Sequence, residues 1–419
     1  MDIVAPNALH DSGHVVDPPK CHPGTRIAII QTIIEWIAGS DENNRGKLIT
    51  WLTGAAGAGK SAIGRSVCER CKKEGTLLAS FFFGSNDPTR NHSKSLIPTI
   101  AYQISMINPG LKKAISDFID YDPLIFTRSL RTQLSSLVID PLLANYNNMP
   151  EKVPPLIVLD GLDECLDQAS QRDILDACLF VVTSSSFPIR ILVCSRPESN
   201  ITSSFGALRM NATVFKVFLG DGYSPDDDIR LYLCDHFQEI RDGHIFKTSI
   251  PLGWPSEEQI SQLLYKASGQ FIYASTVIWY LKSPRHRPHQ RLEAVLGLRP
   301  PFKDLPFAEL DALYTHLLEN TDDLTLAIDL LAFIILYPGV FLTEMEQFFQ
   351  LEAGEVEVVL SDLSSIVRIE NSYDELVARL LHKSFEDFIF DTHRSRHFSR
   401  DYAETRALHI HRLIDMFSG

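Results

Sequence analysis

Short apolar runs alternate with stretches of helical periodicity over the first half of the chain. The runs of strand length are 47–53, 77–84, 154–164, 189–195 and 213–220. Between them, apolar residues recur every three or four positions, as Ile63, Val67 and Cys71 do. Helices are also expected at 93–107, opening on a capping serine, within 128–145 and at 171–184. Strands that alternate with helices predict a parallel sheet covered by helices on both faces.

The pattern changes after residue 220, where helical stretches replace the alternation. Residues 224–240 open with a serine, a proline and three acids, which is typical of the first turn of a helix. Further helices are expected over 256–281 and 307–337. The basic stretch 282–291, KSPRHRPHQR, lies between them and is predicted to be a solvated connector.

A phosphate-binding loop is predicted where the first strand turns into the first helix of the alternating half. The stretch GAAGAGKS fits the pattern G-x-x-x-x-G-K-[ST], in which small residues let backbone N–H groups face phosphate oxygens. The lysine adds a charge at the β and γ phosphates, and the serine hydroxyl is a ligand for Mg²⁺. The predicted phosphate-binding residues are Gly54, Ala55, Ala56, Gly57, Ala58, Gly59, Lys60 and Ser61.

Acidic and basic residues follow two other strands at the same predicted edge of the sheet. Asp160 ends the apolar run LIVLD, where a carboxylate would hold Mg²⁺. Asp163 or Glu164 is the predicted catalytic acid, which would take a proton from an attacking water. Arg196 follows the next strand and either senses the γ-phosphate or only caps the strand end. The guanine-specifying pattern [NT]-K-x-D does not occur, so the predicted base is adenine.

Composition narrows the class of protein. The chain has 419 residues, 45% of them hydrophobic and 22% charged, which predicts a globular protein of two or three packed units. Its net charge of −14 argues against a basic surface for nucleic acid. No secretory signal opens the chain, and the apolar segment 326–342 contains Asp329 and Pro338, so it is predicted to be a core helix. We therefore expect a cytoplasmic protein with reduced cysteines and no membrane partner.

These motifs together resemble the NACHT group of STAND nucleotide-binding switches, especially the fungal NACHT proteins. The stretches that carry the resemblance in the first half are GKLITWLTGAAGAGKSAIGRSVCE, LLASFFFGSND, LIVLDGLDEC and ILVCSRPE. Those in the flanking regions are CHPGTR at 21–26, KASGQFIYASTVIWYL at 266–281 and LHKSFEDFIFD at 381–391. The resemblance spans about residues 21–400.

The resemblance implies a role for residues that the chemistry alone leaves open. Asp160 matches the Walker B acid and Arg196 the sensor arginine. His382 matches a winged-helix histidine that contacts the diphosphate of ADP in the closed state, although its chemistry alone favours a structural histidine at the start of a helix. Thr25 and Arg26 match the base pocket. Phe271 stands where the family has the proline of a Gly-x-Pro segment that contacts the base.

The resemblance also implies the architecture. The expected fold class is an α/β P-loop NTPase sheet of the ASCE/STAND type, followed by a helical domain and a winged-helix domain. The expected divisions are a lead-in segment with the first helix at 1–45, a NACHT domain at 46–220, a helical lid at 221–300 and a winged-helix region at 301–419.

The function that follows is an ATP/ADP-binding switch with slow hydrolysis. ADP would hold the switch closed, and ATP with Mg²⁺ would open it and let it self-associate into an oligomer, with an innate-immunity or cell-death role. The effector or sensor is then a separate protein, or the chain is a truncated or minimal switch.

Three other functions compete with the switch as interpretations of these motifs. The alternative is a scaffold that retains nucleotide without turnover. A small-molecule kinase would need an arginine-rich lid, which is not evident. DNA binding is not expected, because the predicted recognition helix at 354–363 is acidic and lacks Lys and Arg.

Overall fold

The structure is a computed structural model of the chain. It describes residues 3–13, 20–85, 87–145, 155–184, 187–206, 213–219, 225–298, 307–372 and 375–418. Contacts divide the chain into two compact units, 1–223 and 224–419, and each is described by itself. The domain boundaries expected at 220/221 and 300/301 lie outside the described residues. Among the helices described, none combines the length and the apolar character needed to cross a membrane.

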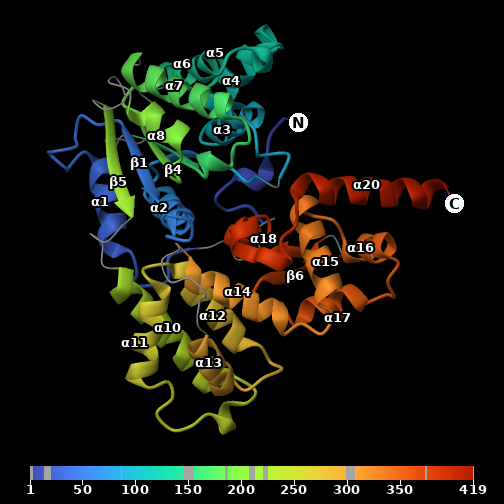
Figure 1. The fold of residues 1–419 in the computed structure, drawn as a ribbon. Helices are drawn as coiled ribbons and strands as arrows, with labels where there is room; N and C mark the ends of the chain where they lie inside the picture. Colours follow the sequence, from blue (N-terminus) through green and yellow to red (C-terminus); the bar gives the residue numbers. More distant parts are fainter. Residues whose placement is uncertain are drawn as a thin grey trace. The chain divides into compact units, whose positions relative to one another are not determined.

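Unit 1 is built on a five-stranded sheet in which every pair of neighbouring strands is parallel (Figure 1). The strands are β1 (Ile49–Gly54), β2 (Leu77–Phe82), β3 (Leu156–Asp160), β4 (Arg190–Ser195) and β5 (Val214–Leu219). Their order is β2-β3-β4-β1-β5, which places β1 inside the sheet between β4 and β5. The parallel sheet predicted from the alternation is confirmed.

Helices cover both faces of this sheet. One face carries α1 (Ile27–Ala38) and α2 (Lys60–Lys73). The other carries α3 (Leu96–Ser105), α4 (Pro109–Tyr121), α5 (Leu130–Leu134), a π-helical turn (Ser135–Ile139), α6 (Asp140–Ala144), α7 (Gln168–Ser184) and α8 (Ser199–Gly206). Along β1, Leu52 packs into the core beneath α2, whereas its neighbour Trp51 packs into the opposite core. Because the strands are buried on both faces, they read as continuous apolar runs.

The predicted start of the helix at 93–107 is wrong in its detail. Residues Ser93–Ser95 form a 3-10 turn, η2, and the α-helix begins only at Leu96, without a side-chain cap. The Ser93 hydroxyl instead donates a hydrogen bond to the hydroxyl of Ser170, near the start of α7, at 3.2 Å. The other short 3-10 turns are η1 (Pro6–Ala8), η3 (Ile125–Thr127), η6 (Leu162–Glu164), η8 (Lys247–Ser249) and η9 (Arg396–Phe398).

Unit 2 is mainly helical. Its first helices are α10 (Pro225–Gly243), α11 (Glu257–Ala267), α12 (Phe271–Lys282), α13 (Pro288–Gly297) and α14 (Ala308–Glu319). There follow α15 (Leu324–Leu336), α16 (Leu342–Phe349), α17 (Glu355–Ser361), β6 (Val367–Ser372), β7 (Glu375–Leu380), α18 (Lys383–Ile389), α19 (Thr392–Ser395) and α20 (Tyr402–Ser418). Strands β6 and β7 form an antiparallel hairpin, and Phe341 adds a single bridge to Val377 of β7.

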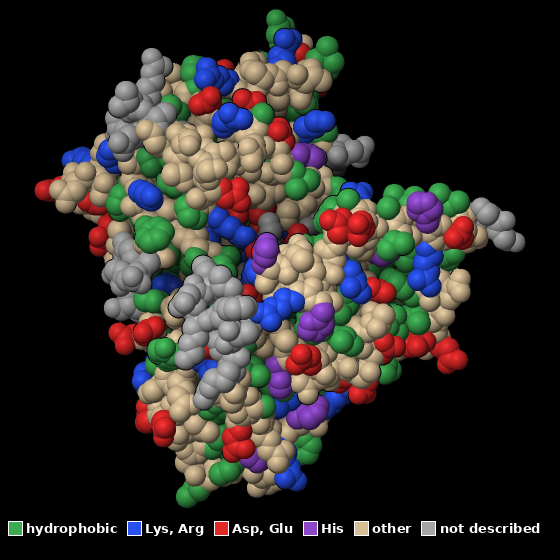
Figure 2. All heavy atoms as spheres, in the orientation of Figure 1, with side chains coloured by type: hydrophobic (Ala, Val, Ile, Leu, Met, Phe, Trp, Pro, Cys, Tyr) green, Lys and Arg blue, Asp and Glu red, His purple; other side chains and the backbone are tan. Residues whose placement is uncertain are grey.

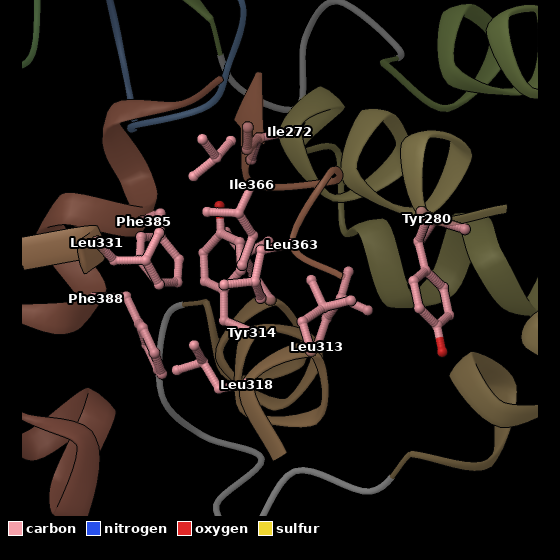
Figure 3. Close-up of a cluster of buried hydrophobic side chains, with 14 of the residues drawn as sticks. Ile272, Tyr280, Leu313, Tyr314, Leu318, Leu331, Leu363, Ile366, Phe385 and Phe388 are labelled. Atoms are coloured by element: carbon pink, nitrogen blue, oxygen red, sulfur yellow. The ribbon is translucent and has the colours of Figure 1, made fainter. Parts of the chain in front are cut away.

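A single apolar core runs through unit 2 (Figure 3). At its centre the Tyr314 ring of α14 lies 5.1 Å from the Phe385 ring of α18. The Tyr314 hydroxyl is 2.8 Å from Ser384 Oγ, which satisfies the one polar atom of that buried side chain. Because this core also takes in residues of α10, α12 and α15, the helices on either side of residue 300 share it.

The connector predicted at 282–291 is helical in its last four residues. Helix α13 begins at Pro288, a residue type favoured in the first turn. The Arg291 guanidinium lies 4.0 Å from the centre of the Tyr280 ring, so this residue packs against α12. The expectation of a solvated stretch is therefore wrong at Arg291, and also at Ser283 and Pro288, which are buried.

Candidate nucleotide site

The phosphate-binding loop lies between β1 and α2, as the sequence predicts. Gly59 has a φ of 91°, a left-handed conformation that costs any residue with a β-carbon, and it directly precedes the first residue of α2. At the start of the loop, a β-carbon on Gly54 would lie 2.9 Å from Cβ of Leu219 in β5. Glycine is thus required at both ends of the loop.

Lys60 holds this loop closed. Its Nζ donates hydrogen bonds to the carbonyl oxygens of Gly54, at 2.9 Å, and Ala55, at 2.8 Å. Burial lowers the pKa of Lys60, while the negative charge of Asp163 opposes that shift. The ammonium group therefore sits over the turn whose N–H groups would face phosphate oxygens.

Asp160 ends β3 beside this loop. The side chain is buried, with 4% of the residue exposed, and its Oδ1 has no hydrogen-bond partner among the described residues. Burial raises the pKa of Asp160 to about 6, and a hydrogen bond from Ser61 and the charge of Arg65 oppose the rise. A buried carboxylate oxygen without a partner, next to a serine hydroxyl, is the donor set that a hard divalent cation takes, so these residues fit Mg²⁺.

Strand register brings the other predicted residues to the same edge of the sheet. Thr53 of β1 pairs with Ser195 of β4, and Asp160 of β3 pairs with Cys194 of β4. The loop, the buried carboxylate and Arg196 therefore follow the ends of three neighbouring strands. Ser195 itself is fully buried and accepts a hydrogen bond from Trp51 Nε1 at 2.8 Å, which gives it a structural role.

Asp163 and Glu164 have different surroundings in η6. Asp163 is tied to Arg196 through both carboxylate oxygens: the Arg196 backbone N–H donates at 3.1 Å, and the guanidinium Nε lies 3.3 Å away. Only 5% of the Asp163 side chain is exposed. Glu164 instead accepts a hydrogen bond from the backbone N–H of Ser85, after β2, at 3.2 Å. The two acids are thus anchored to different strands.

The predicted base-pocket residues Thr25 and Arg26 lie just before α1. Both are buried, and Arg26 has a positive φ of 56°. The Thr25 hydroxyl donates to the carbonyl of His22 at 2.7 Å. Arg26 Nη2 donates to the carbonyl of Ala58 in the phosphate loop at 3.1 Å. Arg26 therefore supports the loop, and its contact with a base stays a prediction.

Phe271 and His382 belong to unit 2, so the structure places them only within that unit. Phe271 opens α12, and its ring centre is 6.1 Å from that of Tyr232. His382 Nε2 lies 3.3 Å from the Ser275 hydroxyl of α12. Burial lowers the pKa of His382 to about 4, and the nearby charge of Arg368 acts in the same direction. Their contacts with a nucleotide stay predictions.

Sequence reasoning missed two features beside this site. Gly64 lies within α2, and a β-carbon there would be 3.5 Å from Asp160 Oδ1, so the helix approaches the carboxylate closely. A glycine inside a helix is unfavourable, and that was the available signal. Segment 3–13, whose sequence has no periodicity, packs against β2, α2 and α3 through hydrogen bonds that only the structure shows.

The fold and this arrangement define unit 1 as a P-loop NTPase domain. The chain is similar to the family described as Nephrocystin 3, N-terminal, whose model matches residues 25–196 and so includes the predicted site residues of unit 1. No curated protein matches the chain.

Several solved structures match at low similarity. The ORC2 protein of Aeropyrum pernix (ADPNP-ADP complexes) is 14% identical, with a TM-score of 0.42, over 88% of this chain and 92% of that one. Cdc6p from Pyrobaculum aerophilum is 14% identical, with a TM-score of 0.39, over 87% and 92%. Drosophila ORC bound to DNA is 12% identical, with a TM-score of 0.36, over 90% and 97%. Similarity at this level of identity and TM-score supports no conclusion about this chain.

A pH dependence follows from the surroundings of His382. Its folded-state pKa of about 4 lies below the ordinary 6.5, so the unfolded chain takes up the proton first as pH falls. The stability conferred by the neutral imidazole is complete above pH 6.5 and is lost between 6.5 and 4. We expect the difference in unfolding free energy between the unaltered chain and His382→Gln to shrink by about 1–3 kcal/mol from pH 7.5 to 4.5. Urea unfolding measures this difference.

The matched control is His393→Gln, because His393 is an exposed histidine of the same unit. A difference between the unaltered chain and His382→Gln that stays constant over this pH range would contradict the assignment of a neutral, partly buried imidazole.

Proposed function

We propose that unit 1 binds ATP or ADP with Mg²⁺ and that the chain is a nucleotide-dependent switch of the NACHT type. The observation that most supports this is that the phosphate loop and Asp160 lie at one edge of the sheet, where the buried Oδ1 of Asp160 has no hydrogen-bond partner among the described residues. Ala58 is the residue of this loop that packs in the core, and a buried carboxylate oxygen without a hydrogen-bond partner destabilises the fold.

Each residue of the site has a defined task in this proposal. Backbone N–H groups of the loop and Nζ of Lys60 bind the phosphates, and Lys60 exchanges its two carbonyl partners for phosphate oxygens. Ser61 and Asp160 hold Mg²⁺, which when bound neutralises and orients the phosphates. Thr25, Arg26 and Phe271 are assigned to the base.

The contacts of the two acids support a division of labour in hydrolysis. Asp163 holds the backbone and guanidinium of Arg196, and so fixes the cation that would stabilise charge on the γ-phosphate. Glu164 accepts a hydrogen bond from the backbone N–H of Ser85, and we assign to it the removal of a proton from the attacking water.

Unit 2 is proposed to report the nucleotide state. The order of α15, α16 and α17 followed by the β6–β7 hairpin supports a winged helix, and the bridge from Phe341 to Val377 supports its third strand. Helix α17 carries Glu355 and Glu357 in its first turn and has no basic residue, so we do not propose DNA as a partner. On the face shown in Figure 2, basic and acidic side chains of the described residues are interspersed. Self-association in the ATP state and signalling to a separate effector or sensor complete the proposal.

Replacement of Lys60 tests nucleotide binding. Lys60→Ala leaves phosphate oxygens without their cation, and we expect affinity for ADP and ATP to fall by at least about 30-fold. Titration with a fluorescent adenine nucleotide measures the loss. Lys73→Ala, an exposed lysine at the end of the same helix, is the control and should bind normally. Equal affinity in Lys60→Ala and the unaltered chain would end the P-loop assignment.

Replacement of the two acids tests hydrolysis. Glu164→Gln should slow release of inorganic phosphate about 100-fold or more without changing nucleotide affinity, because only the proton acceptor is lost. Asp163→Asn should have the smaller effect, through a loosened Arg196. If Asp163→Asn slows phosphate release more than Glu164→Gln does, Asp163 is the proton acceptor and Glu164 has the supporting role. No turnover in the unaltered chain would instead favour a nucleotide-retaining scaffold.

A further inference from the structure

Residues 3–13, called the strap below, lie across three elements of unit 1. The backbone N–H of Ala5 donates to Thr99 Oγ1 of α3 at 2.9 Å, and that of His10 donates to Ser80 Oγ of β2 at 3.1 Å. Ala5 and Ala8 are fully buried. The strap therefore packs as part of the core beside β2, the outermost strand of the sheet on that side.

Arg65 of α2 connects the strap to the helix that carries the phosphate-binding lysine. Its Nη1 donates to the carbonyl of His10 at 2.8 Å, and its guanidinium lies 4.2 Å from the centre of the Phe82 ring. Only 5% of Arg65 is exposed, and its Nε has no hydrogen-bond partner among the described residues. A buried guanidinium with so few partners depends strongly on each of them, the strap carbonyl included.

The same part of α2 lies against the metal-binding carboxylate. Gly64 precedes Arg65, and a β-carbon at Gly64 would be 3.5 Å from Asp160 Oδ1. Burial lowers the pKa of Arg65, and the negative charge of Asp160 opposes that shift. The first two turns of α2 thus contain both Lys60 and Ser61, which face the proposed phosphate site, and Arg65, which bonds the strap.

We propose that Arg65 is a positioning residue that couples the seating of the strap to the binding of nucleotide and Mg²⁺ at Lys60, Ser61 and Asp160. With the strap seated, the His10 carbonyl holds Arg65 and fixes the start of α2 against Asp160. With the strap displaced, Arg65 loses the hydrogen bond from its Nη1 to the His10 carbonyl, and α2 loses that restraint. The inference rests on the proposed nucleotide function and adds a control element to it.

Coupling of this kind works in both directions. If the seated strap raises nucleotide affinity, bound nucleotide must hold the strap in place by the same factor. A molecule that binds or displaces the strap would therefore change the affinity of the site for nucleotide. Binding of nucleotide would in turn change how firmly the strap is held at the edge of the sheet.

Variants that displace the strap test the coupling without touching the site. Ala8→Glu puts a carboxylate into a fully buried position, so the strap should leave. We expect affinity for Mg·ADP to fall about 10-fold, the scale of one hydrogen bond to a charged group. Ser80→Ala, which removes the acceptor of the His10 N–H, is a milder variant with an expected loss of about 3-fold. Ile3→Glu, at an exposed position of the strap, is the control and should bind as the unaltered chain does.

Arg65 itself is tested by a double-mutant cycle. Arg65→Met should weaken Mg·ADP binding as Ala8→Glu does, Arg65→Lys should recover part of the loss, and the double variant should be no worse than either single one. Hydrogen exchange of the strap amides gives a second readout. Mg·ADP should slow exchange at residues 5–12 in the unaltered chain but not in Arg65→Met.

Three outcomes would overturn an assignment. Free exchange of the strap amides in Ala8→Glu with unchanged Mg·ADP affinity would exclude the coupling, as would additive losses in the double variant. Absence of nucleotide binding in the unaltered chain would instead overturn the proposed function. That result comes from the unaltered chain alone, so it is distinct from a failure of the coupling.

Discussion

The buried carboxylate of Asp160 is the constraint on which the candidate site depends. Burial favours its neutral form, yet Mg²⁺ needs the ionised one, so the surrounding groups must favour the charge. Ser61 and Arg65, both from α2, do so. Helix α2 runs directly beside the carboxylate, because a β-carbon at Gly64 would be in van der Waals contact with Asp160 Oδ1, at 3.5 Å. The position of α2 against β3 therefore decides whether the phosphate loop and the carboxylate act on the same ligand.

Parallel pairing extends this constraint to the rest of unit 1. The register of β1, β3 and β4 brings the phosphate loop, Asp160 and Arg196 to one edge, although they are far apart in the sequence. Asp163 then links β3 to β4 through Arg196, and Glu164 links β3 to the residue after β2. The strap joins β2 to α2, because His10 bonds both Ser80 of β2 and Arg65 of α2. Loss of any one of these contacts would change the surroundings of the Asp160 carboxylate.

Much of this could be predicted from the sequence, for physical reasons. Strands buried on both faces must be apolar throughout, so β3 and β4 were visible as runs that end in polar residues. The phosphate loop needs glycine at fixed positions, which leaves a recognisable pattern. The strap could not be predicted, because its contacts are backbone N–H groups meeting Ser80 and Thr99, and such hydrogen bonds leave no periodicity. Arg65 was missed because a cation on a helix usually faces water, whereas here it packs between the Phe82 ring and the strap.

The measurement that tests the central claim most directly is identification of the nucleotide that the purified chain holds or takes up. The account predicts stoichiometric ADP or ATP, released on denaturation or bound on titration, with affinity that depends on Mg²⁺ and with no comparable binding of guanine nucleotides. A folded chain that neither carries nor binds an adenine nucleotide, with or without Mg²⁺, would contradict it.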